Sequence, residues 1–255
     1  MGFNNPNMPW SEVERLLSGR SAGPRGKDGR APGSASWNAG GDGPALGRKR
    51  QPYEPADPDA TQPLWRPDVV LWAGPRTHFV HYPLRRGELY NLVAVFHSDH
   101  YEEGWDAEGS KELLWKHFSG QVPQVLRMLE RIETWRMWVL CDREPVKNWS
   151  RGNVTLLGDA AHPMLQYLAQ GACMATEDAI MLAEKVAAEP DDLPSAFEAY
   201  QQERYLRTGR TQIMARVYGE FYHARGVAAE LRDMALAGRT PQQSYDGIAW
   251  LYGGP

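Results

Sequence analysis

Hydrophobic and polar residues alternate between positions 68 and 96 in three short runs. The runs VVLWAG, THFVHYPLRRG and ELYNLVAVF have the two-residue period of β-strands, and RRGE between the last two is typical of a turn. Side chains two apart on a strand share a face, so His78 and Tyr82 are expected on one side. His81 faces the opposite side, where we expect it to pack or to lie at the surface. The pattern predicts a small sheet.

Apolar residues at helical spacing dominate the rest of the chain. Residues 112–129 predict two helices broken around 120–123, and residues 136–140 predict a further strand. We expect a helix to begin at Gly171 and a long amphipathic helix to follow Pro190, with its arginine-rich face in solvent. Strands and helices mixed in this way indicate an α/β (α+β) fold.

The first 56 residues differ in composition from the rest. Residues 1–55 contain 10 Gly and 7 Pro, and Trp37 is the only large apolar residue between positions 21 and 45. Such a segment buries too little apolar surface to offset its ordering entropy, so we expect a disordered Gly/Pro-rich tail over 1–56 and one folded domain over 57–255. The tail is weakly basic, but GRKR is short and the net charge of the chain is −4, so no nucleic-acid binding is expected.

The two cysteines, Cys141 and Cys173, form no disulfide framework and no metal-ligand spacing. We expect both to be small buried residues in a reducing cytoplasm and no metal site. No apolar run approaches 18 residues, and no signal sequence follows Met1. The sequence predicts a cytoplasmic protein without a membrane segment.

Residues 152–179, GNVTLLGDAAHPMLQYLAQGACMATEDA, carry the most specific chemistry. Residues 154–157 predict a short buried strand, and Gly158 permits a sharp turn where a side chain would obstruct a ligand. Asp159 follows at the carboxyl end of the strand, where a carboxylate can accept hydrogen bonds from a sugar diol. The backbone N–H groups at the start of the next helix favour negative charge. They belong to Gly171, Ala172 and Cys173.

This run resembles the second flavin motif of the class A FAD-dependent aromatic hydroxylases, of the 3-hydroxybenzoate 6-hydroxylase and salicylate hydroxylase type. The resemblance implies that Asp159, after Gly158, binds the FAD ribose. It also implies that His162 and Pro163 lie close to the isoalloxazine, and that the helix start faces the flavin pyrimidine oxygen. The implied cofactor-binding set is Gly158, Asp159, His162, Pro163, Gly171, Ala172 and Cys173.

The match extends to GPRTHFVHYPLRRGELYNLVAV, which implies that His78 and Tyr82 lie at the substrate pocket and address a phenolic hydroxyl. A His/Tyr pair can accept or relay the phenol proton. On periodicity alone, both are more often core or rim residues with a satisfied polar tip. Gln166 is implied to lie near substrate and flavin, although a loop amide can equally stabilise only its own backbone.

The resemblance also implies a reaction. NADH or NADPH reduces FAD, O2 is activated at the flavin, and a small phenolic substrate is hydroxylated. The leading expectation is conversion of 3-hydroxybenzoate to gentisate, with salicylate or another monohydroxybenzoate still open. A homodimer is plausible for the parent enzyme.

The family's amino-terminal GxGxxG fingerprint has no counterpart here. The candidates Gly23, Gly26 and Gly29 are wrongly spaced and follow no apolar strand. We therefore expect a partial class A hydroxylase fold that lacks the Rossmann unit. Two hypotheses remain: a truncated FAD-dependent monooxygenase, or a non-catalytic remnant unable to hold FAD alone. Residues 1–55 resemble the start of an error-prone alpha-type DNA polymerase subunit without its catalytic carboxylates, so a junction of two unrelated reading frames is expected and no polymerase activity.

Overall fold

The computed structural model describes residues 68–87, 89–98, 107–132 and 134–253. The tail expected over residues 1–56, with its resemblance to a polymerase subunit, lies outside the described residues. So does the start of the domain expected over 57–255.

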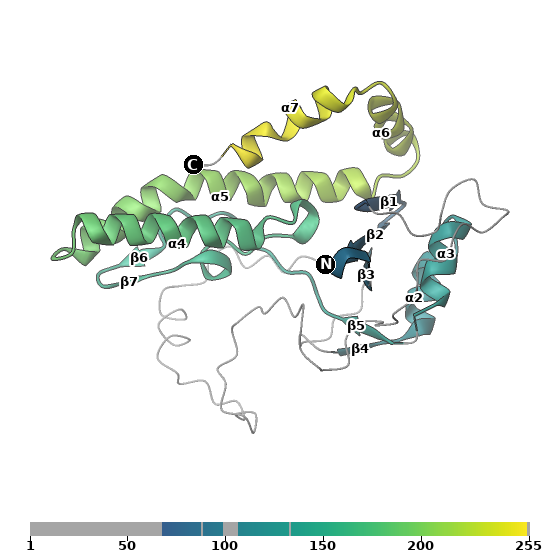
Figure 1. Cartoon of the computed structure of the whole chain (residues 1–255), viewed down its shortest axis with the longest axis horizontal. Helices are drawn as coiled ribbons and strands as arrows, with labels where there is room; N and C mark the ends of the chain where they lie inside the picture. Colours follow the sequence, from purple (N-terminus) through teal and green to yellow (C-terminus); the bar gives the residue numbers. More distant parts are fainter. Residues whose placement is uncertain (1–67, 88, 99–106, 133, 254–255) are drawn as a thin grey trace.

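Three antiparallel strands form the predicted sheet, in the order β1-β2-β3 (Figure 1). Strand β2 pairs with both neighbours and places His78 opposite Ala73 and Val95. A short 3₁₀ turn at Arg85–Gly87 joins the last two strands, as the RRGE run predicted. The alternation over residues 68–96 was therefore interpreted correctly. The strands are β1 Val70–Gly74, β2 Thr77–Leu84 and β3 Leu89–Phe96.

One face of the sheet packs against two short helices, α2 (Lys111–Phe118) and α3 (Pro123–Glu130). Phe79, on the β2 face opposite His78, is fully buried together with Phe118 in the hydrophobic core between the sheet and these helices. Pro123 begins α3 because its missing N–H is not needed in a first helical turn. The two predicted helices and the break between them are confirmed.

Two small hairpins complete the β structure. Strand β4 (Ala107–Gly109) pairs with β5 (Trp135–Met137), and β6 (Ser150–Arg151) pairs with β7 (Val154–Thr155). The strand predicted over 136–140 is thus shorter and begins earlier. The prediction of a buried strand over 154–157 was wrong, because a hairpin of two residues per strand leaves Val154 44% and Leu157 36% exposed.

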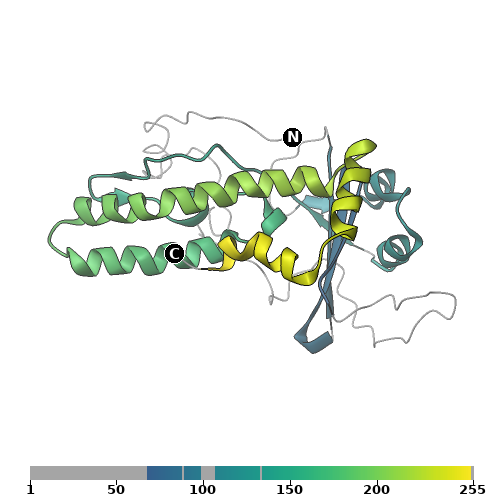
Figure 2. The ribbon, with the colours of Figure 1, turned by 90° about the horizontal axis from the view of Figure 1, so that it is seen from above.

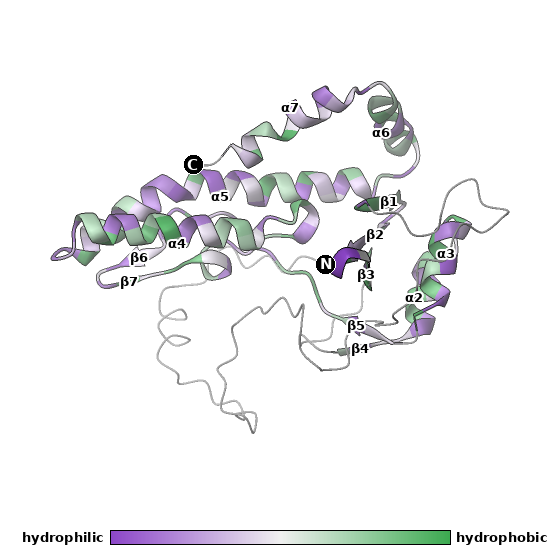
Figure 3. Ribbon diagram, in the orientation of Figure 1, coloured by the Kyte–Doolittle hydropathy of each residue, from purple (hydrophilic) through white to green (hydrophobic). Residues whose placement is uncertain are grey.

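Helix α4 (Gly171–Ala188) lies antiparallel to the long helix α5 (Leu193–Tyr222), and the sheet crosses near the far end of α5 (Figures 1 and 2). Helices α6 (Val227–Ala237) and α7 (Pro241–Tyr252) then fold back along α5. Figure 3 shows that α6 is largely hydrophobic, and Leu231 and Met234 on it are exposed. The sequence pattern had not predicted these last two helices.

A second core lies where α5 meets the segment before α4. It buries Trp149, Ala161, Met181 and Tyr200. The expectation that the arginines of α5 face solvent was wrong for Arg204, which is fully buried. Among the described helices, none combines the length and the apolarity needed to cross a bilayer.

Candidate functional site

The GD turn depends on a left-handed glycine. Gly158 has a φ of 59°, which only glycine adopts without strain. A Cβ at this position would also lie 3.0 Å from the Cβ of Ala175 on α4. The turn Gly158–Ala160 therefore sits close to α4 and leaves the Asp159 side chain exposed at the surface.

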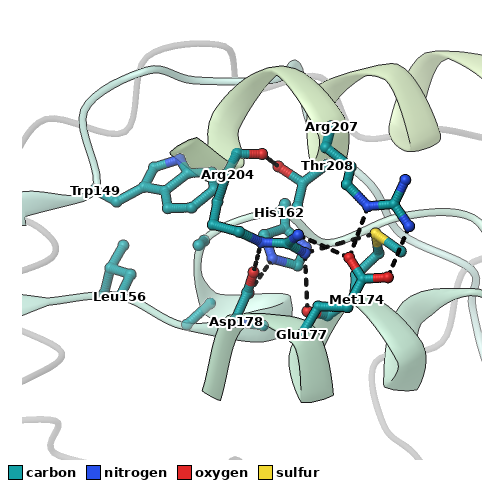
Figure 4. A network of polar contacts seen from close by, with 12 residues as sticks. Trp149, Leu156, His162, Met174, Glu177, Asp178, Arg204, Arg207 and Thr208 are labelled. Carbon is teal, nitrogen blue, oxygen red and sulfur yellow. Dashed lines mark hydrogen bonds and ion pairs between the residues drawn. The ribbon is translucent and has the colours of Figure 1, made fainter. Parts of the chain in front are cut away.

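The carboxylate of Asp178 fixes this turn from inside (Figure 4). Its Oδ2 accepts a hydrogen bond from the backbone N–H of Gly158 at 3.0 Å and lies 2.5 Å from Nε2 of His162. His162 and Asp178 are both fully buried. The structure thus turns His162 inward, toward α4, and not toward the exposed carboxylate of Asp159.

Arginines from α5 neutralise the buried acid. Arg204 donates to Oδ1 of Asp178 at 2.7 Å and to Glu177 at 2.7 Å, and Arg207 binds both oxygens of Glu177. Burial alone would raise the pKa of Asp178, but hydrogen bonds from His162, Arg204 and Gly158 together hold it below its ordinary value. Glu177 and Asp178 therefore hold the two arginines of α5 against the start of α4.

Two further side chains hold the backbone of the loop. Arg143 donates to the carbonyl oxygens of Ala160 and Ala161, and Gln212 donates to the carbonyl of Pro163 at 2.9 Å. These contacts give Arg143 and Gln212 a structural role at the loop. The loop is fixed at its carbonyls and at His162, so the direction of Asp159 is set by the fold.

The start of α4 lies beside this turn. Gly171 is close enough to Asp159 that a Cβ on it would lie 3.7 Å from Oδ1. Ala172 and Cys173 are exposed, and the first N–H groups of an α-helix have no partner within the helix. The expectation that both cysteines are buried was wrong: Cys173 opens a helix whose first turn faces outward, and Cys141 lies in an exposed extended segment.

A pocket of about 420 Å³ opens between the sheet and the far end of α5. Its wall includes Gln166 and Tyr167 from the loop before α4, His97 from the end of β3, and Arg216 and His223 from α5. Gly219 permits the close approach of loop and helix, because a Cβ there would overlap the ring of Tyr167. The pocket and the GD turn are joined by one short loop.

The predicted substrate residues divide over three places. Gln166 lies at the wall of the pocket. His78 lies behind the wall, 3% exposed, with Nδ1 2.7 Å from Nε2 of His223. Tyr82 accepts a hydrogen bond from Asn91 at 2.8 Å and does not line the pocket. His78 and Tyr82 share a strand face, but they stand four positions apart along β2.

Sequence reasoning missed the residues that organise the site from a distance. His223 caps α5 and contacts His78 from a position 145 residues later in the sequence. Asp178 and Arg204 pair from adjacent helices. No local motif marks these residues.

Comparison with known proteins places the fold and the family. The sequence model described as "FAD binding domain" matches residues 58–215. A 3-hydroxybenzoate 6-hydroxylase of Polaromonas naphthalenivorans (strain CJ2) is 49% identical over 183 residues, which cover 72% of this chain and 46% of that protein. Its counterpart in Klebsiella oxytoca is 48% identical over 184 residues, with the same coverage.

Solved structures agree on the fold. A salicylate hydroxylase substrate complex has a TM-score of 0.60 at 23% identity and is matched over 73% of this chain and 47% of its own. HpxO of Klebsiella pneumoniae, complexed with FAD and uric acid, has a TM-score of 0.62 at 24% identity, over 73% and 48%. This chain spans about half the length of the curated relatives it matches. The matched range contains the sheet, the GD turn and α4, and the chain belongs to the FAD binding domain family, with the flavoprotein hydroxylase fold.

Proposed function

We propose that this chain carries the flavin-facing and phenol-facing part of an FAD-dependent monooxygenase, which hydroxylates a monohydroxybenzoate with NADH or NADPH and O2. The best candidate reaction is 3-hydroxybenzoate to gentisate, because the curated relatives at 46–49% identity carry that hydroxylase name. One observation carries the proposal. The exposed Asp159 faces the open start of α4, and the same loop leads to Gln166 at the pocket wall.

The residues of the turn fit one side of FAD. Asp159 offers an exposed carboxylate to ribose hydroxyls. The N–H groups at Gly171, Ala172 and Cys173 suit the electron-rich oxygen of the flavin pyrimidine. His162 supports the turn through Asp178, and Pro163 continues it. FAD, when bound, supplies the activation of O2.

On the phenol side we assign three residues. His78 is the proposed base for the phenolic hydroxyl, Gln166 orients the ring from the pocket wall, and Tyr82 supports the same strand face. Burial lowers the pKa of His78 to about 3, with His223 and His97 adding to the effect. His78 is therefore neutral at working pH, and the burial that lowers its pKa also makes it a weaker base than a free imidazole.

The alternative is a non-catalytic remnant that cannot hold FAD alone. It is supported by the exposure of Val154 and Leu157 beside the turn. Exposed apolar residues at such a position are typical of a surface that needs a further packing partner to exclude water.

Titration of the purified chain with FAD, followed by quenching of flavin fluorescence, separates the two. We expect saturable binding that Asp159→Ala weakens by about tenfold or more, the usual cost of a lost charged hydrogen bond. Asp191→Ala removes an exposed carboxylate in the α4–α5 loop and is the matched control. Failure to bind FAD, or equal loss in both variants, would favour the remnant.

Turnover tests the substrate. NADH oxidation in the presence of FAD should rise with 3-hydroxybenzoate and not with benzoate, which lacks the phenol, and gentisate should accumulate. Parallel reactions with NADPH in place of NADH identify the reductant. Parallel reactions with salicylate in place of 3-hydroxybenzoate identify the preferred hydroxybenzoate. No rise with either hydroxybenzoate in an FAD-loaded chain would refute the assignment.

A homodimer in the cytoplasm completes the proposal. Exposed apolar residues on α6 and α7, such as Met234 and Tyr245, suit a contact between copies. Light scattering at several concentrations tests it, and Met234→Asp should then shift the mass toward the monomer.

A further inference from the structure

One buried amide on α5 joins the two parts of the proposed site. Nε2 of Gln212 donates to the carbonyl oxygen of Arg143 at 3.1 Å and to that of Pro163 at 2.9 Å. Gln212 is 1% exposed, and an amide nitrogen carries two N–H donors. The side chain therefore uses both donors on two segments that are distant in sequence.

The contact with Pro163 is made between the turn and the pocket. Pro163 stands four positions after Asp159 and three positions before Gln166, which lines the pocket. Residues 161–165 lie between two 3₁₀ turns and belong to no helix or strand. Side chains of other elements must therefore hold this stretch of backbone.

The contact with Arg143 reaches the same two places from the other side. The guanidinium of Arg143 donates to the carbonyl oxygens of Ala160 and Ala161 in the turn segment. Asp142, the residue before it, lines the pocket. Loss of the Gln212 amide would therefore loosen a pocket wall and a support of the turn at the same time.

The acceptors determine the orientation of this amide. Both partners are backbone carbonyl oxygens, which only accept, so the NH2 group of Gln212 faces them and its oxygen does not. A buried carbonyl that loses its donor is costly to the fold. Removal of the amide takes one donor from each segment.

An anchor of this kind affects binding at both ends of the segment. A ligand that binds to a loosely held segment must order it first, and the lost conformational entropy weakens the binding. A segment that is already fixed does not carry this cost for either ligand. Two ligands at its ends then bind nearly independently of each other.

We propose that Gln212 is a positioning residue that pre-organises the flavin-facing turn and the ligand pocket together. Gln212 does not line the pocket, and it acts through the backbone of Arg143 and Pro163. Without its amide, each ligand has to order the segment, so each binds more weakly and the first to bind assists the second. The two ligands, FAD at Asp159 and a monohydroxybenzoate in the pocket, are those of the proposed function, on which this inference rests.

Gln212→Met removes the donors and keeps the length of the side chain. The matched control is Gln201→Met. Gln201 lies on the same helix, is 2% exposed, and accepts with its amide oxygen from the backbone N–H groups of Trp149 and Ser150. Those two residues lie at the start of the β6–β7 hairpin and do not line the pocket. Each variant thus loses a buried amide with two backbone partners.

Urea denaturation shows whether both variants fold, through a cooperative unfolding transition. Gln212→Asn keeps the amide but shortens its reach. If methionine at this position prevents folding, the asparagine variant replaces it in every measurement, with expected changes of at least about threefold in place of tenfold.

Amide hydrogen exchange followed by mass spectrometry needs no ligand. We expect Gln212→Met to speed the exchange over residues 158–169 by at least about tenfold, because this segment opens more often without its anchor. The N–H groups of Ala161, His162 and Ala169 are hydrogen-bonded within this segment. Gln201→Met should speed exchange in the β6–β7 hairpin only. Unchanged exchange over 158–169 in Gln212→Met would overturn the inference.

Fluorescence titrations measure the two affinities. FAD binding is followed by flavin quenching, and 3-hydroxybenzoate binding by the emission of tryptophan, since Trp135 and Trp138 line the pocket. Gln212→Met should raise both dissociation constants by about tenfold, whereas Gln201→Met should keep them within about twofold of the wild type.

The same titrations with the second ligand at saturation measure the coupling. Saturating 3-hydroxybenzoate should change the FAD affinity of the wild type by less than about twofold, and should strengthen that of Gln212→Met by at least about threefold. Equal affinity losses in Gln212→Met and Gln201→Met, or a loss at one site alone, would contradict the proposed role. Failure of the wild-type chain to bind either ligand counts against the proposed function, while the exchange experiment still decides whether Gln212 holds the segment.

Discussion

Asp178 and Arg204 form a fully buried ion pair, with Nε of Arg204 2.7 Å from Oδ1 of Asp178. The other carboxylate oxygen of Asp178 holds Gly158 and His162. The pair therefore ties α4 and α5 to the loop that presents Asp159. A buried ion pair is poor evidence of net stabilisation, but the removal of one partner is costly because the other charge is left without compensation.

Asp178→Asn should lower the free energy of unfolding by about 3 kcal/mol or more, because the guanidinium of Arg204 stays buried and loses its countercharge. Urea denaturation measures the loss. Glu184→Gln makes the same chemical change at an exposed position of α4 and should stay within about 0.5 kcal/mol of the wild type. Similar losses of unfolding free energy in both variants would mean that the buried ion pair contributes no more than an exposed carboxylate.

Gly158→Ala should destabilise the chain more than Gly152→Ala does. Both residues have positive φ, 59° and 56°, and the backbone strain of alanine there is about 1–2 kcal/mol. Only at Gly158 does the new methyl group meet a neighbour, the Cβ of Ala175 at 3.0 Å, whereas at Gly152 nothing lies within 4 Å. The difference between the two unfolding free energies isolates this contact. Equal losses of unfolding free energy in the two variants would show that α4 shifts to accommodate the methyl group.

Gly219→Ala should disturb the pocket, because the methyl group would overlap the ring of Tyr167. We expect a cost of about 1–3 kcal/mol, typical of overpacking, together with a change in tyrosine near-ultraviolet circular dichroism. Gly247→Ala on α7 meets nothing within 4 Å and should be neutral or stabilising by up to about 1 kcal/mol. A stabilised Gly219→Ala chain would show that the loop before α4 moves freely.

Stability should fall as the pH drops from 6.5 toward 4. The pKa values of His78 and His223 are lowered to about 3 and about 4 in the folded chain, while the unfolded chain protonates histidine near pH 6.5. The unfolded state then binds more protons in this window, so the free energy of unfolding falls with acidification, by about 3 kcal/mol or more.

Thermal or urea denaturation at half-unit steps of pH measures this slope. Replacement of one titrating group, His78→Asn, should make the slope shallower between pH 6.5 and 4. Asp178, whose pKa is lowered, adds its loss only below about pH 4. A flat profile between pH 6.5 and 4 would contradict the buried neutral histidines.

Local patterns were sufficient for the three-stranded sheet and for the helices from α2 to α5. The two-residue period over 68–96 predicted three strands and the shared face of His78 and Tyr82, because strand geometry determines side-chain direction. The helix start at Gly171 followed from the change of period and from the glycine itself. These predictions depend on neighbours in sequence.

Long-range contacts could not be read in the same way. Arg204 looked like a solvent-facing residue in sequence. Helix periodicity does not show that the carboxylate of Asp178, 26 residues earlier, lies on the neighbouring helix. His223 is a plain helix end in sequence, and its contact with His78 depends on how α5 meets the sheet. Val154 looked buried because a run of apolar residues in a strand usually packs against another layer of the protein.

Arg207 gives the end of the chain a role in this arrangement. Besides Glu177, it donates to the carbonyl oxygens of Trp250 and Leu251 in the last turn of α7, at 3.1 Å each. Those carbonyls lack partners within the helix, so the guanidinium of Arg207 supplies their hydrogen bonds and places a positive charge at the negative end of the helix dipole. Helix α7 is thus fastened to the acid that neighbours Asp178. A fusion partner placed directly after Tyr252 should therefore weaken the contacts of Arg207 with the end of α7.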